Sequence, residues 1–375
     1  MDFEAEFEKI RPYNDSEVKD AIEELLTDDN FDKISKYFIS EPKAESLKEL
    51  REINTIEEFQ NKYSHRFVRR IINETTDGLT SSGSDEIIRK GHLFIANHRD
   101  IVLDSAFLQI MLIDNGLPTS EITVGDNLMA NSLFNVLGKL NKVFTLYRGG
   151  GKIQMYKNAV LHSKYIHNLI REKNDSLWIA QRDGRTKDGK DKTQQGLIKM
   201  LLGDRRDIVN ALEELAIVPI SMSYEFEPCL RMKTRELYIS SYQEYVKQDD
   251  EDMYSTTSSM LAYKGRVHIA FCEGINKKIK NANFDNLSNN EIVDFFVKEI
   301  DNEIYKNYKL WPNNYIAFDI LNNTNKFINE YSTQEKSIFE TYLMKSISDI
   351  EGDAKEIKEI ALGIYANPLK NKFNL

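Results

Sequence analysis

In the stretch Leu93-Phe94-Ile95-Ala96-Asn97-His98-Arg99-Asp100-Ile101-Val102-Leu103-Asp104, a histidine and two carboxylates follow directly on an apolar run. The run from Leu93 to Ala96 predicts a short buried strand, because it is apolar throughout and too short for a helix. A neutral imidazole at His98 can take the proton of a hydroxyl, and a carboxylate on its second nitrogen would fix the tautomer. By itself, this pattern is as typical of a structural histidine at a strand end as of a catalytic base.

Further short apolar runs alternate with helical patterns between residues 91 and 275. The runs are His92–Ala96, Ile122–Val124, Val143–Tyr147, Leu177–Ala180, Ile217–Met222 and Val267–Phe271. Such alternation is typical of an α/β domain whose sheet is buried on both faces. We therefore predict an α/β fold with a central, mainly parallel, mixed sheet flanked by helices.

The first 90 residues have mainly helical periodicity. A capping-box pattern at Thr55 and Glu58 precedes an apolar stripe at helical spacing, which we expect to belong to the core. The stripe consists of Phe59, Tyr63, Phe67 and Ile71. The helical pattern ends by Gly78, and residues 81–84 predict a loop because they are serines and a glycine.

The helical pattern returns after residue 275, where Ser288 and Glu291 form a second capping box. The sequence contains no internal repeat. We therefore predict three parts, a helical N-terminal region (1–90), an α/β domain (91–275) and a helical C-terminal region (276–375).

Composition limits the classes of partner. Of the 375 residues, 41% are apolar and 29% are charged, which is typical of an ordered globular protein. The net charge of −10 argues against nucleic acid as a partner, and an anionic substrate would need a local basic cluster. Cys229 and Cys272 are too few for a disulfide framework or a zinc site, so we predict no metal.

The sequence begins Met-Asp-Phe-Glu-Ala-Glu, without the basic and apolar segments of a signal peptide. No stretch approaches the ~20 consecutive apolar residues of a membrane-spanning helix. We therefore expect a cytoplasmic protein. Peripheral binding to the inner face of the membrane is compatible with the same sequence.

Three more polar segments follow or open predicted strands. Tyr147-Arg148-Gly149-Gly150-Gly151 combines an arginine with glycines whose backbone N–H groups can approach a phosphate. Arg182-Asp183-Gly184-Arg185-Thr186-Lys187-Asp188-Gly189 places three cations around a turn. Val218-Pro219-Ile220 opens a buried strand, and because proline lacks an N–H, we expect this strand to begin at an edge or a bulge.

Together, in this order and spacing, the four segments resemble the motifs of the glycerol-3-phosphate and lysophosphatidate acyltransferase superfamily. His98 matches the histidine of the first motif, H-x-x-x-x-D, and Arg148 matches the arginine that ends the second. Arg185-Thr186 corresponds to the Arg-Ser pair of the third motif, E-G-x-R-S, and Val218-Pro219-Ile220 to the fourth, V-P-I. The resemblance covers residues 90 to 275.

Two further segments are similar to the branch that acylates glycerol 3-phosphate or dihydroxyacetone phosphate. Gly125-Asp126-Asn127-Leu128 resembles its glycine-x-asparagine-leucine segment. Lys192-Thr193-Gln194-Gln195-Gly196-Leu197 resembles the lysine-threonine-glycine stretch after its third motif.

The chain departs from the family pattern in the first motif. The family spacing would place the aspartate at position 103, which is leucine here, with Asp100 and Asp104 on either side. We favour Asp104 as the partner of His98, with Asp100 as the alternative, because Asp100 occupies a helix-capping position.

A second departure affects the third motif. An ungapped match places Arg182 on the family's glutamate, whereas a one-residue deletion aligns Asp183-Gly184 with Glu-Gly. We favour the second alignment because it keeps an acid.

The resemblance implies transfer of a fatty acyl group from a thioester donor, acyl-CoA or acyl-carrier protein, to a hydroxyl of glycerol 3-phosphate or lysophosphatidate in phospholipid synthesis. His98 would act as the base and Asp104 would orient it, with no cofactor beyond the acyl donor. Backbone N–H groups near residues 98–104 are the expected oxyanion donors.

The acceptor's phosphate would be held by Arg148, Arg185 and Lys187. Gly149, Arg182, Gly184 and Pro219 complete the predicted binding residues. Asp183 would hold the loop or a second acceptor hydroxyl. The basic stretch from Arg231 to Arg235 could meet an acidic carrier or lipid head groups, although a solvated surface is its commoner role.

Two other classes compete with this hypothesis. His98-Arg99-Asp100 also opens the catalytic loop of protein kinases, but the sequence has no glycine-rich nucleotide loop or D-F-G motif in place. A non-catalytic lipid-binding or acyl-carrier-binding module on the same scaffold is the stronger alternative, because the two motif departures favour it. Thiol release from an acyl thioester separates that module from an enzyme.

Overall fold

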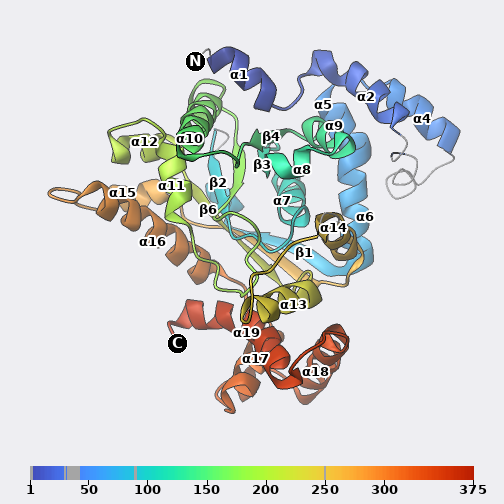
Figure 1. Ribbon diagram of the computed structural model, residues 1–375, viewed down its shortest axis with the longest axis vertical. Coiled ribbons are helices and arrows are strands. Elements are labelled where there is room, and N and C mark those ends of the chain that lie inside the picture. The colour runs from blue at the N-terminus through green and yellow to red at the C-terminus, as the bar shows by residue number, and fades with distance from the viewer. Residues whose placement is uncertain (1–2, 29–30, 32–42, 88–90, 249–250) are drawn as a thin grey trace.

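A seven-stranded mixed sheet forms the centre of the protein in the computed structural model, which describes residues 3–28, 31, 43–87, 91–248 and 251–375 (Figure 1). The strand order is β1-β7-β6-β2-β5-β3-β4. The strands are β1 (Thr76–Ser82), β2 (Leu93–Ala96), β3 (Glu121–Gly125), β4 (Val143–Leu146), β5 (Leu177–Ala180), β6 (Val218–Tyr224) and β7 (Gly265–Phe271). Five of the six pairings are parallel and only β6 with β7 is antiparallel, so the predicted mainly parallel, mixed α/β sheet is confirmed.

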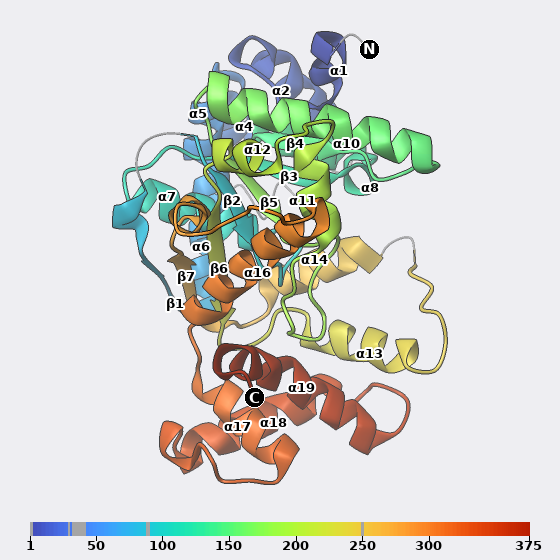
Figure 2. The ribbon, with the colours of Figure 1, turned by 90° about the vertical axis from the view of Figure 1, so that its left-hand side faces the viewer.

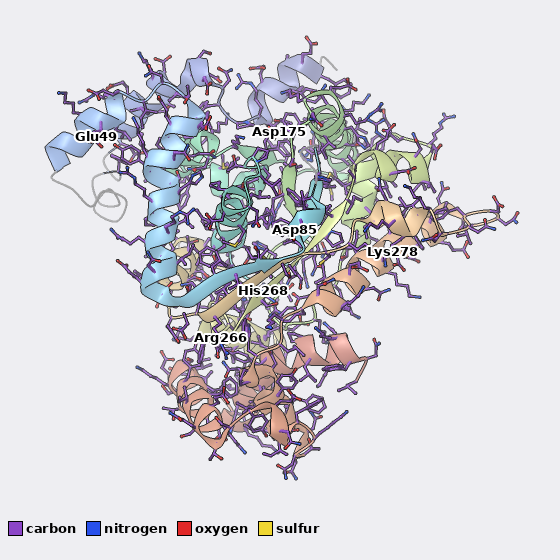
Figure 3. The ribbon with its side chains drawn as sticks, turned by 180° about the vertical axis from the view of Figure 1, so that it is seen from behind. Glu49, Asp85, Asp175, Arg266, His268 and Lys278 are labelled. Atoms are coloured by element: carbon purple, nitrogen blue, oxygen red, sulfur yellow. The ribbon has the colours of Figure 1, made fainter. Side chains whose placement is uncertain are left out.

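All six predicted strands are present, and β1 is a strand that the sequence pattern did not predict. Residues 81 and 82, expected in a loop, belong to it, and Ser81 pairs with Ile269 of β7. Figure 3 shows β1 following α6 (His65–Thr75) and running beside the part of β7 that carries Arg266 and His268. The prediction was wrong because β1 is an edge strand whose mostly polar side chains stay exposed, so pairing with β7 specifies it rather than local propensity.

Each face of the sheet packs against its own core. Leu93 and Ile95 of β2 point to one core, and Phe94 and Ala96 point to the other, as the alternation of a doubly covered strand requires. The first core is covered by α10 (Lys152–His167), α11 (Gln195–Leu202), α12 (Ile208–Glu214), α15 (Ile275–Ile279) and α16 (Asn289–Asn307). The second is covered by α6, α7 (Leu103–Asp114) and α8 (Asp126–Met129).

Two helical groups extend the domain at its ends (Figure 2). The N-terminal group packs with α9 (Ser132–Leu140) and contains α2 (Val18–Thr27), α4 (Lys43–Arg51) and α5 (Ile56–Phe59), while α1 (Phe3–Ile10) lies against α10. The C-terminal group contains α13 (Leu230–Ser240), α17 (Pro312–Asn322), α18 (Thr333–Ile347) and α19 (Ala354–Phe373). A remaining helix, α14 (Glu251–Leu261), contacts α6. Among the described residues, no helix is both long and apolar enough to cross a membrane.

Pro219 lies in an interior strand, so the expectation of an edge or bulge was wrong. It pairs in register with Ile95 of β2, and β6 lies between β2 and β7. Its carbonyl accepts a hydrogen bond from the N–H of Cys272 at 2.9 Å, one residue past the end of β7. The missing N–H of Pro219 therefore lies on the side of β7, at the end of the β6–β7 ladder, which limits its cost to the sheet.

The parallel strands bring the predicted site residues to one edge. Strands β2, β3, β4, β5 and β6 all run in the same direction. The segments after β2, β4 and β5 carry His98, Arg148 and Arg182, and they emerge together at the carboxyl edge of the sheet. Ligands of open α/β sheets bind at this edge.

Candidate active site

Asn97 ends the central strand and lets the chain turn away from the sheet. Its side-chain amide donates to the carbonyl of Met222 at 3.0 Å and accepts from the N–H of the same residue at 2.7 Å. The side chain thus replaces one rung of backbone pairing with β6, and His98 leaves the sheet at a fixed position. The carbonyl of His98 accepts from the N–H of Thr186 at 2.7 Å, which attaches the loop after β5 to the same turn.

His98 and Asp104 form the dyad that the sequence suggested. His98 Nδ1 lies 2.9 Å from Asp104 Oδ2, and the histidine side chain retains 13% exposure, whereas Asp104 is fully buried. The imidazole stands edge-on to Trp178, with ring centroids 5.6 Å apart. Because Nδ1 is engaged, Nε2 is the ring nitrogen that can accept a proton.

Asp104 is held by four donors. Besides His98, its carboxylate accepts from the N–H groups of Arg99 at 2.6 Å and Asp100 at 2.9 Å, and from the phenol of Tyr224 at 2.7 Å. Burial alone would raise the pKa of Asp104, but these hydrogen bonds and the charge of the imidazolium outweigh it and lower the pKa below its ordinary value. Asp104 therefore stays ionised beside His98.

Asp100 has a different task from Asp104. Its Oδ1 accepts from the N–H groups of Val102 at 3.0 Å and Leu103 at 2.8 Å, which caps the start of α7, and Ser259 donates to Oδ2. Of the two carboxylates left open by the sequence, Asp104 contacts the imidazole and Asp100 closes the turn.

The same hydrogen bonds reduce the number of N–H groups that could serve as the expected oxyanion donors. Within residues 98–104, the N–H groups of Arg99 and Asp100 point to Asp104, and those of Val102 and Leu103 point to Asp100. These four N–H groups are consumed by the turn itself, so they are not free to hold an oxyanion.

A cleft of about 340 Å³ opens beside His98 and collects most of the other predicted residues. Its walls include Arg148, Arg182, Asp183, Gly184, Arg185 and Lys187. Gly149 and Pro219 are not among the described residues that line it. Residues Gly125, Asn127 and Leu128, from the glycine-x-asparagine-leucine resemblance, line the wall as well.

The cations of this cleft differ in how far they are neutralised. Arg148 Nη1 pairs with Asp183 Oδ1 at 2.6 Å, and Lys187 pairs with Glu236. Arg185 donates to the neutral hydroxyl of Ser255 at 2.7 Å and has no carboxylate partner in the described part of the chain. Arg182 Nε is buried without any hydrogen-bond partner there. Among the described residues, Arg182 and Arg185 are therefore the cations of the cleft that no carboxylate neutralises directly, although Glu251 also lines the cleft.

Gly125 leaves room for the side chain of Arg148. A Cβ at this position would lie 2.7 Å from Arg148 Nε and 2.8 Å from Cζ, closer than real Cβ contacts allow. The absence of a side chain lets the guanidinium cross the end of β3 on its way to Asp183.

A fully buried charge network, which the sequence pattern did not predict, lies behind the dyad. Arg99 Nη2 contacts Asp191 Oδ2 at 2.5 Å and Tyr308 at 3.3 Å, and Nη1 contacts Glu227 Oε2 at 3.1 Å. Lys233 donates to Glu227 at 2.5 Å and to the carbonyl of Arg99 at 2.6 Å. Arg99 thereby joins the turn that carries His98 to β6, α13 and the segment after α16.

The C-terminal region also fixes the cationic loop. Gly189 has φ +75°, and a Cβ there would lie 2.3 Å from the carbonyl oxygen of Ile364 on α19. Asn367 donates to the carbonyl of Asp188 at 2.6 Å, and Asn371 donates to that of Lys190 at 2.8 Å. The helices after residue 275, which lie outside the family resemblance, therefore support the site.

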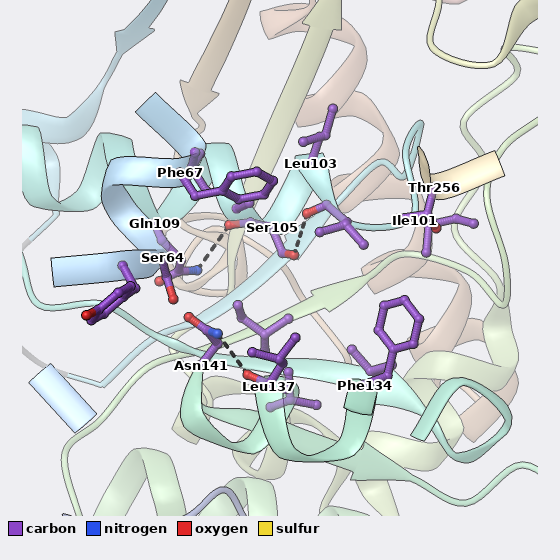
Figure 4. Close-up of a pocket in the computed structure, with 18 of the residues that line it drawn as sticks. Ser64, Phe67, Ile101, Leu103, Ser105, Gln109, Phe134, Leu137, Asn141 and Thr256 are labelled. Carbon is purple, nitrogen blue, oxygen red and sulfur yellow. Dashed lines mark hydrogen bonds between the residues drawn. The ribbon is translucent and has the colours of Figure 1, made fainter. Parts of the chain in front are cut away.

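A second, apolar cavity of about 240 Å³ adjoins the cleft (Figure 4). Phe67, Leu137 and Phe134 are among its lining residues, together with side chains from α2, α7 and α14. The two spaces share wall residues, namely Ile101, Ser105, Val124, Leu128 and Asp252. The apolar cavity therefore begins where the polar cleft beside His98 ends.

The apolar stripe of the N-terminal region lines this cavity. Phe59, Tyr63, Phe67 and Ile71, expected as ordinary core, all stand on its wall. The helical period identified the stripe as buried but could not distinguish a filled core from the lining of a cavity. Only the positions of α7, α9 and α14 opposite it make the difference.

Among the described residues, no group of three or more His, Cys, Asp or Glu side chains could hold a metal ion. Cys272 is buried, Cys229 is partly buried, and both are free thiols.

No protein-family model and no curated protein matches this chain. Among solved structures, the chain resembles the crystal structure of the 1-acyl-sn-glycerophosphate (LPA) acyltransferase, PlsC, from Thermotoga maritima. The identity is 13% and the TM-score 0.34, and the match covers 76% of this chain and 91% of that chain.

Proposed function

We propose that this protein is a glycerolipid O-acyltransferase. It would move a fatty acyl group from a thioester donor, acyl-CoA or acyl-carrier protein, to a hydroxyl of glycerol 3-phosphate or lysophosphatidate. The observation that carries the proposal is the place of His98, which lies on a cationic cleft that shares a wall with an apolar cavity.

The dyad supports the chemistry. His98 Nε2 would accept the proton of the acceptor hydroxyl while its oxygen attacks the thioester carbonyl carbon. The resulting tetrahedral intermediate collapses with cleavage of the C–S bond, and the imidazolium returns its proton to the leaving thiolate. Asp104, ionised and bound to Nδ1, stabilises the imidazolium in between.

The cleft's cations support a phosphorylated acceptor. Within the described part of the chain, Arg182 and Arg185 lack carboxylate partners, and Arg148 shares its charge with Asp183, whose side chain is 67% exposed. An exposed ion pair of this kind is worth about 0–1 kcal/mol, so a phosphate dianion could displace Asp183 from Arg148 at little cost.

The apolar cavity supports a fatty acyl group. Its lining is formed mainly by aliphatic and aromatic side chains, including Phe67, Val68 and Met260. An acyl chain in this cavity could place its carbonyl near Ile101 and Ser105, on the wall shared with the cleft. Both substrates would then meet beside His98.

Thiol release from acyl thioesters tests the proposal. We expect wild-type protein to release thiol from acyl-CoA or acyl-carrier protein only when glycerol 3-phosphate or lysophosphatidate is added, with formation of the acylated product. His98→Ala should lower turnover by about 100- to 10,000-fold while the protein stays folded.

His268→Gln is the matched control, because His268 lies on β7 and contacts Thr80 and Ser82 of the edge strand rather than the cleft. Its turnover should equal wild type. Binding of the thioester without thiol release under any acceptor would instead identify a non-catalytic lipid-binding or acyl-carrier-binding module. Radiolabelled acyl donors offered with each acceptor in turn would identify the substrates.

A further inference from the structure

The first turn and a half of α10 is exposed on every side. All residues from Lys152 to Lys157 are exposed, including Ile153 at 76%, Met155 at 55% and Tyr156 at 59%. The first buried residue of the helix is Asn158. We call Lys152, Ile153, Met155, Tyr156 and Lys157 the α10 tip.

An ordinary surface helix turns one apolar stripe toward the protein. The α10 tip has no such face, because Ile153, Met155 and Tyr156 point in different directions around the helix and all three are exposed. Figure 2 shows this end of α10 projecting beyond the body of the protein at the right-hand edge of the view. Three large, exposed apolar side chains close together on a projection are typical of a surface that meets an external apolar phase.

The positive charge of the α10 tip indicates what kind of surface it would bind. Lys152 and Lys157 flank the apolar residues, and no ion pair holds either lysine among the described residues. No side chain caps the start of α10, so its first N–H groups add to the positive end. In a protein of net charge −10, this local positive charge favours an anionic surface.

The tip is also close along the chain to the wall of the cleft. Arg148, which lines the cleft, precedes Lys152 by only the three glycines at 149–151. Lys247, in the segment after α13, also lines the cleft, and its neighbour Val246 is 73% exposed. Figure 2 shows the segment after α13 on the same side of the molecule as the α10 tip.

We propose that the α10 tip is a docking element for a lipid bilayer that contains anionic lipids. Ile153, Met155 and Tyr156 insert at the boundary between head groups and acyl chains, and Lys152 and Lys157 contact lipid phosphates. Docking would direct the mouth of the cleft at the membrane, where a lipid acceptor is taken up and the product returned. This last consequence rests on the proposed function, whereas docking itself does not.

Vesicle co-sedimentation of the full chain tests the proposal. Vesicles of equimolar phosphatidylcholine and phosphatidylglycerol are compared with vesicles of phosphatidylcholine alone. Wild-type protein should bind the anionic vesicles, and more weakly at high salt. The triple variant Ile153→Gln, Met155→Gln and Tyr156→Gln should bind roughly tenfold more weakly or worse, because three partly inserted apolar side chains are lost. The double variant Lys152→Gln and Lys157→Gln should lose the preference for anionic vesicles.

The matched control removes three exposed apolar side chains from the opposite end of the molecule. Ile328→Gln, Ile338→Gln and Met344→Gln alter residues that are about as exposed, at 48%, 52% and 48%, and should leave vesicle binding unchanged. The tip variants lie outside the cleft lining, so their turnover on detergent-solubilised substrates should equal wild type, which shows that they are folded.

The outcomes separate docking from catalysis. Vesicle binding that depends on the tip supports the proposal even if the protein transfers no acyl group. Failure of the wild type to bind either vesicle, equal binding by the triple variant, or equal loss in the control overturns it. A further outcome is that the protein binds no vesicles and instead binds an acyl-carrier protein through the α10 tip. That result would also overturn the proposal, because the partner of the tip would then be a protein.

Discussion

Tyr224 and His98 share one carboxylate, because the phenol of Tyr224 donates to Asp104 Oδ1 at 2.7 Å while His98 Nδ1 lies 2.9 Å from Oδ2. Tyr224 ends β6 and is fully buried, so the strand beside β2 fixes the orientation of the acid and, through it, the imidazole. A dyad built this way depends on a residue 120 positions away along the chain.

Removing the phenol should weaken the dyad without removing it. We expect Tyr224→Phe to lower kcat by about 3- to 30-fold with little change in KM, because a buried hydrogen bond to a charged group is worth about 1.5–3 kcal/mol and only part of it acts on the imidazolium. The acidic limb of the kcat profile should also move, since Asp104 loses a donor that lowers its pKa. Steady-state kinetics across pH measures both effects.

Tyr165→Phe is the control for this variant. The phenol of Tyr165 also donates to a buried carboxylate, that of Glu121, at 2.8 Å, but it lies outside the cleft lining. Its loss should cost stability and leave the pH profile of kcat in place. If both variants changed kcat and the profile equally, Tyr224 would have only a structural role.

Substitutions of the two aspartates of the turn, Asp100 and Asp104, should have different effects on kcat. Asp104→Asn keeps the shape but cannot stabilise the imidazolium, so kcat should fall by about 100-fold or more. Asp100→Asn weakens the cap of α7 and should cost about 1 kcal/mol of stability with a kcat within roughly tenfold of wild type. Urea unfolding and turnover of both variants give the comparison. A larger kinetic loss in Asp100→Asn than in Asp104→Asn would contradict these roles.

The sequence could predict the sheet and most of the cleft, because both depend on local patterns. Buried strands such as β2 and β5 are continuous apolar runs, and parallel strands bring the residues that follow them to one edge. The sequence alone could therefore predict that His98, Arg148 and Arg185 lie close together. The helix-capping position of Asp100 also left Asp104 as the favoured partner of His98.

Long-range polar contacts and empty space could not be predicted. Arg99, Asp191, Glu227 and Tyr308 meet across more than 200 residues, and a pairing between isolated charged residues has no periodicity to reveal it. Strand β1 was not predicted because its polar residues form a strand only by pairing with β7. The apolar cavity was not predicted because an apolar stripe has the same sequence pattern whether the space that it faces is filled by side chains or empty.

The cleft's phosphate site predicts opposite effects for a cation and its acidic partner. Arg185→Ala should raise the acceptor KM by roughly tenfold or more, since a charge-assisted contact of about 1.5–3 kcal/mol is lost. Asp183→Asn should lower the acceptor KM by up to about fivefold, because Arg148 is released from an exposed pair worth about 0–1 kcal/mol. Acceptor titrations at saturating donor measure both.

Arg231→Ala controls for the loss of any surface arginine, because Arg231 pairs with exposed Asp349 away from this cleft. Its acceptor KM should not change. A rise in KM for Asp183→Asn would instead mean that Asp183 holds a hydroxyl of the acceptor.

Arg99 should be needed as an arginine and not merely as a positive charge. Arg99→Lys keeps the charge but cannot reach Asp191 and Glu227 together, so we expect a loss of about 3–5 kcal/mol in the free energy of unfolding, comparable to a broken buried pair. Because Arg99 adjoins His98, kcat should fall as well. Arg266→Lys is the control, since Arg266 forms a two-point contact with Glu225 at the surface and should cost about 1 kcal/mol or less. Equal losses in the two variants would mean that the buried network contributes no more to the free energy of unfolding than a surface ion pair does.

Glu121 should make the protein less stable as pH rises. Burial raises the pKa of Glu121 from its ordinary value of 4.5 to about 7, despite the hydrogen bond from Tyr165, which lowers it. Between these two values the unfolded chain loses its proton while the folded chain keeps it, so the free energy of unfolding falls with pH. The decline is complete above pH 7 and amounts to roughly 3 kcal/mol.

Replacing Glu121 with glutamine removes this titration and keeps an acceptor for Tyr165. The stability of Glu121→Gln relative to wild type should therefore rise by roughly 3 kcal/mol between about pH 4.5 and pH 8, as measured by urea unfolding at each pH. His162 and His167, whose pKa values burial lowers to about 4, act in the opposite direction, but they are present in both proteins and cancel in the difference. Glu57→Gln, at an exposed position on α5, should show no such trend. A difference for Glu121→Gln that stays constant with pH would show that Glu121 is already ionised in the folded protein, and that water reaches its carboxylate more than its burial implies.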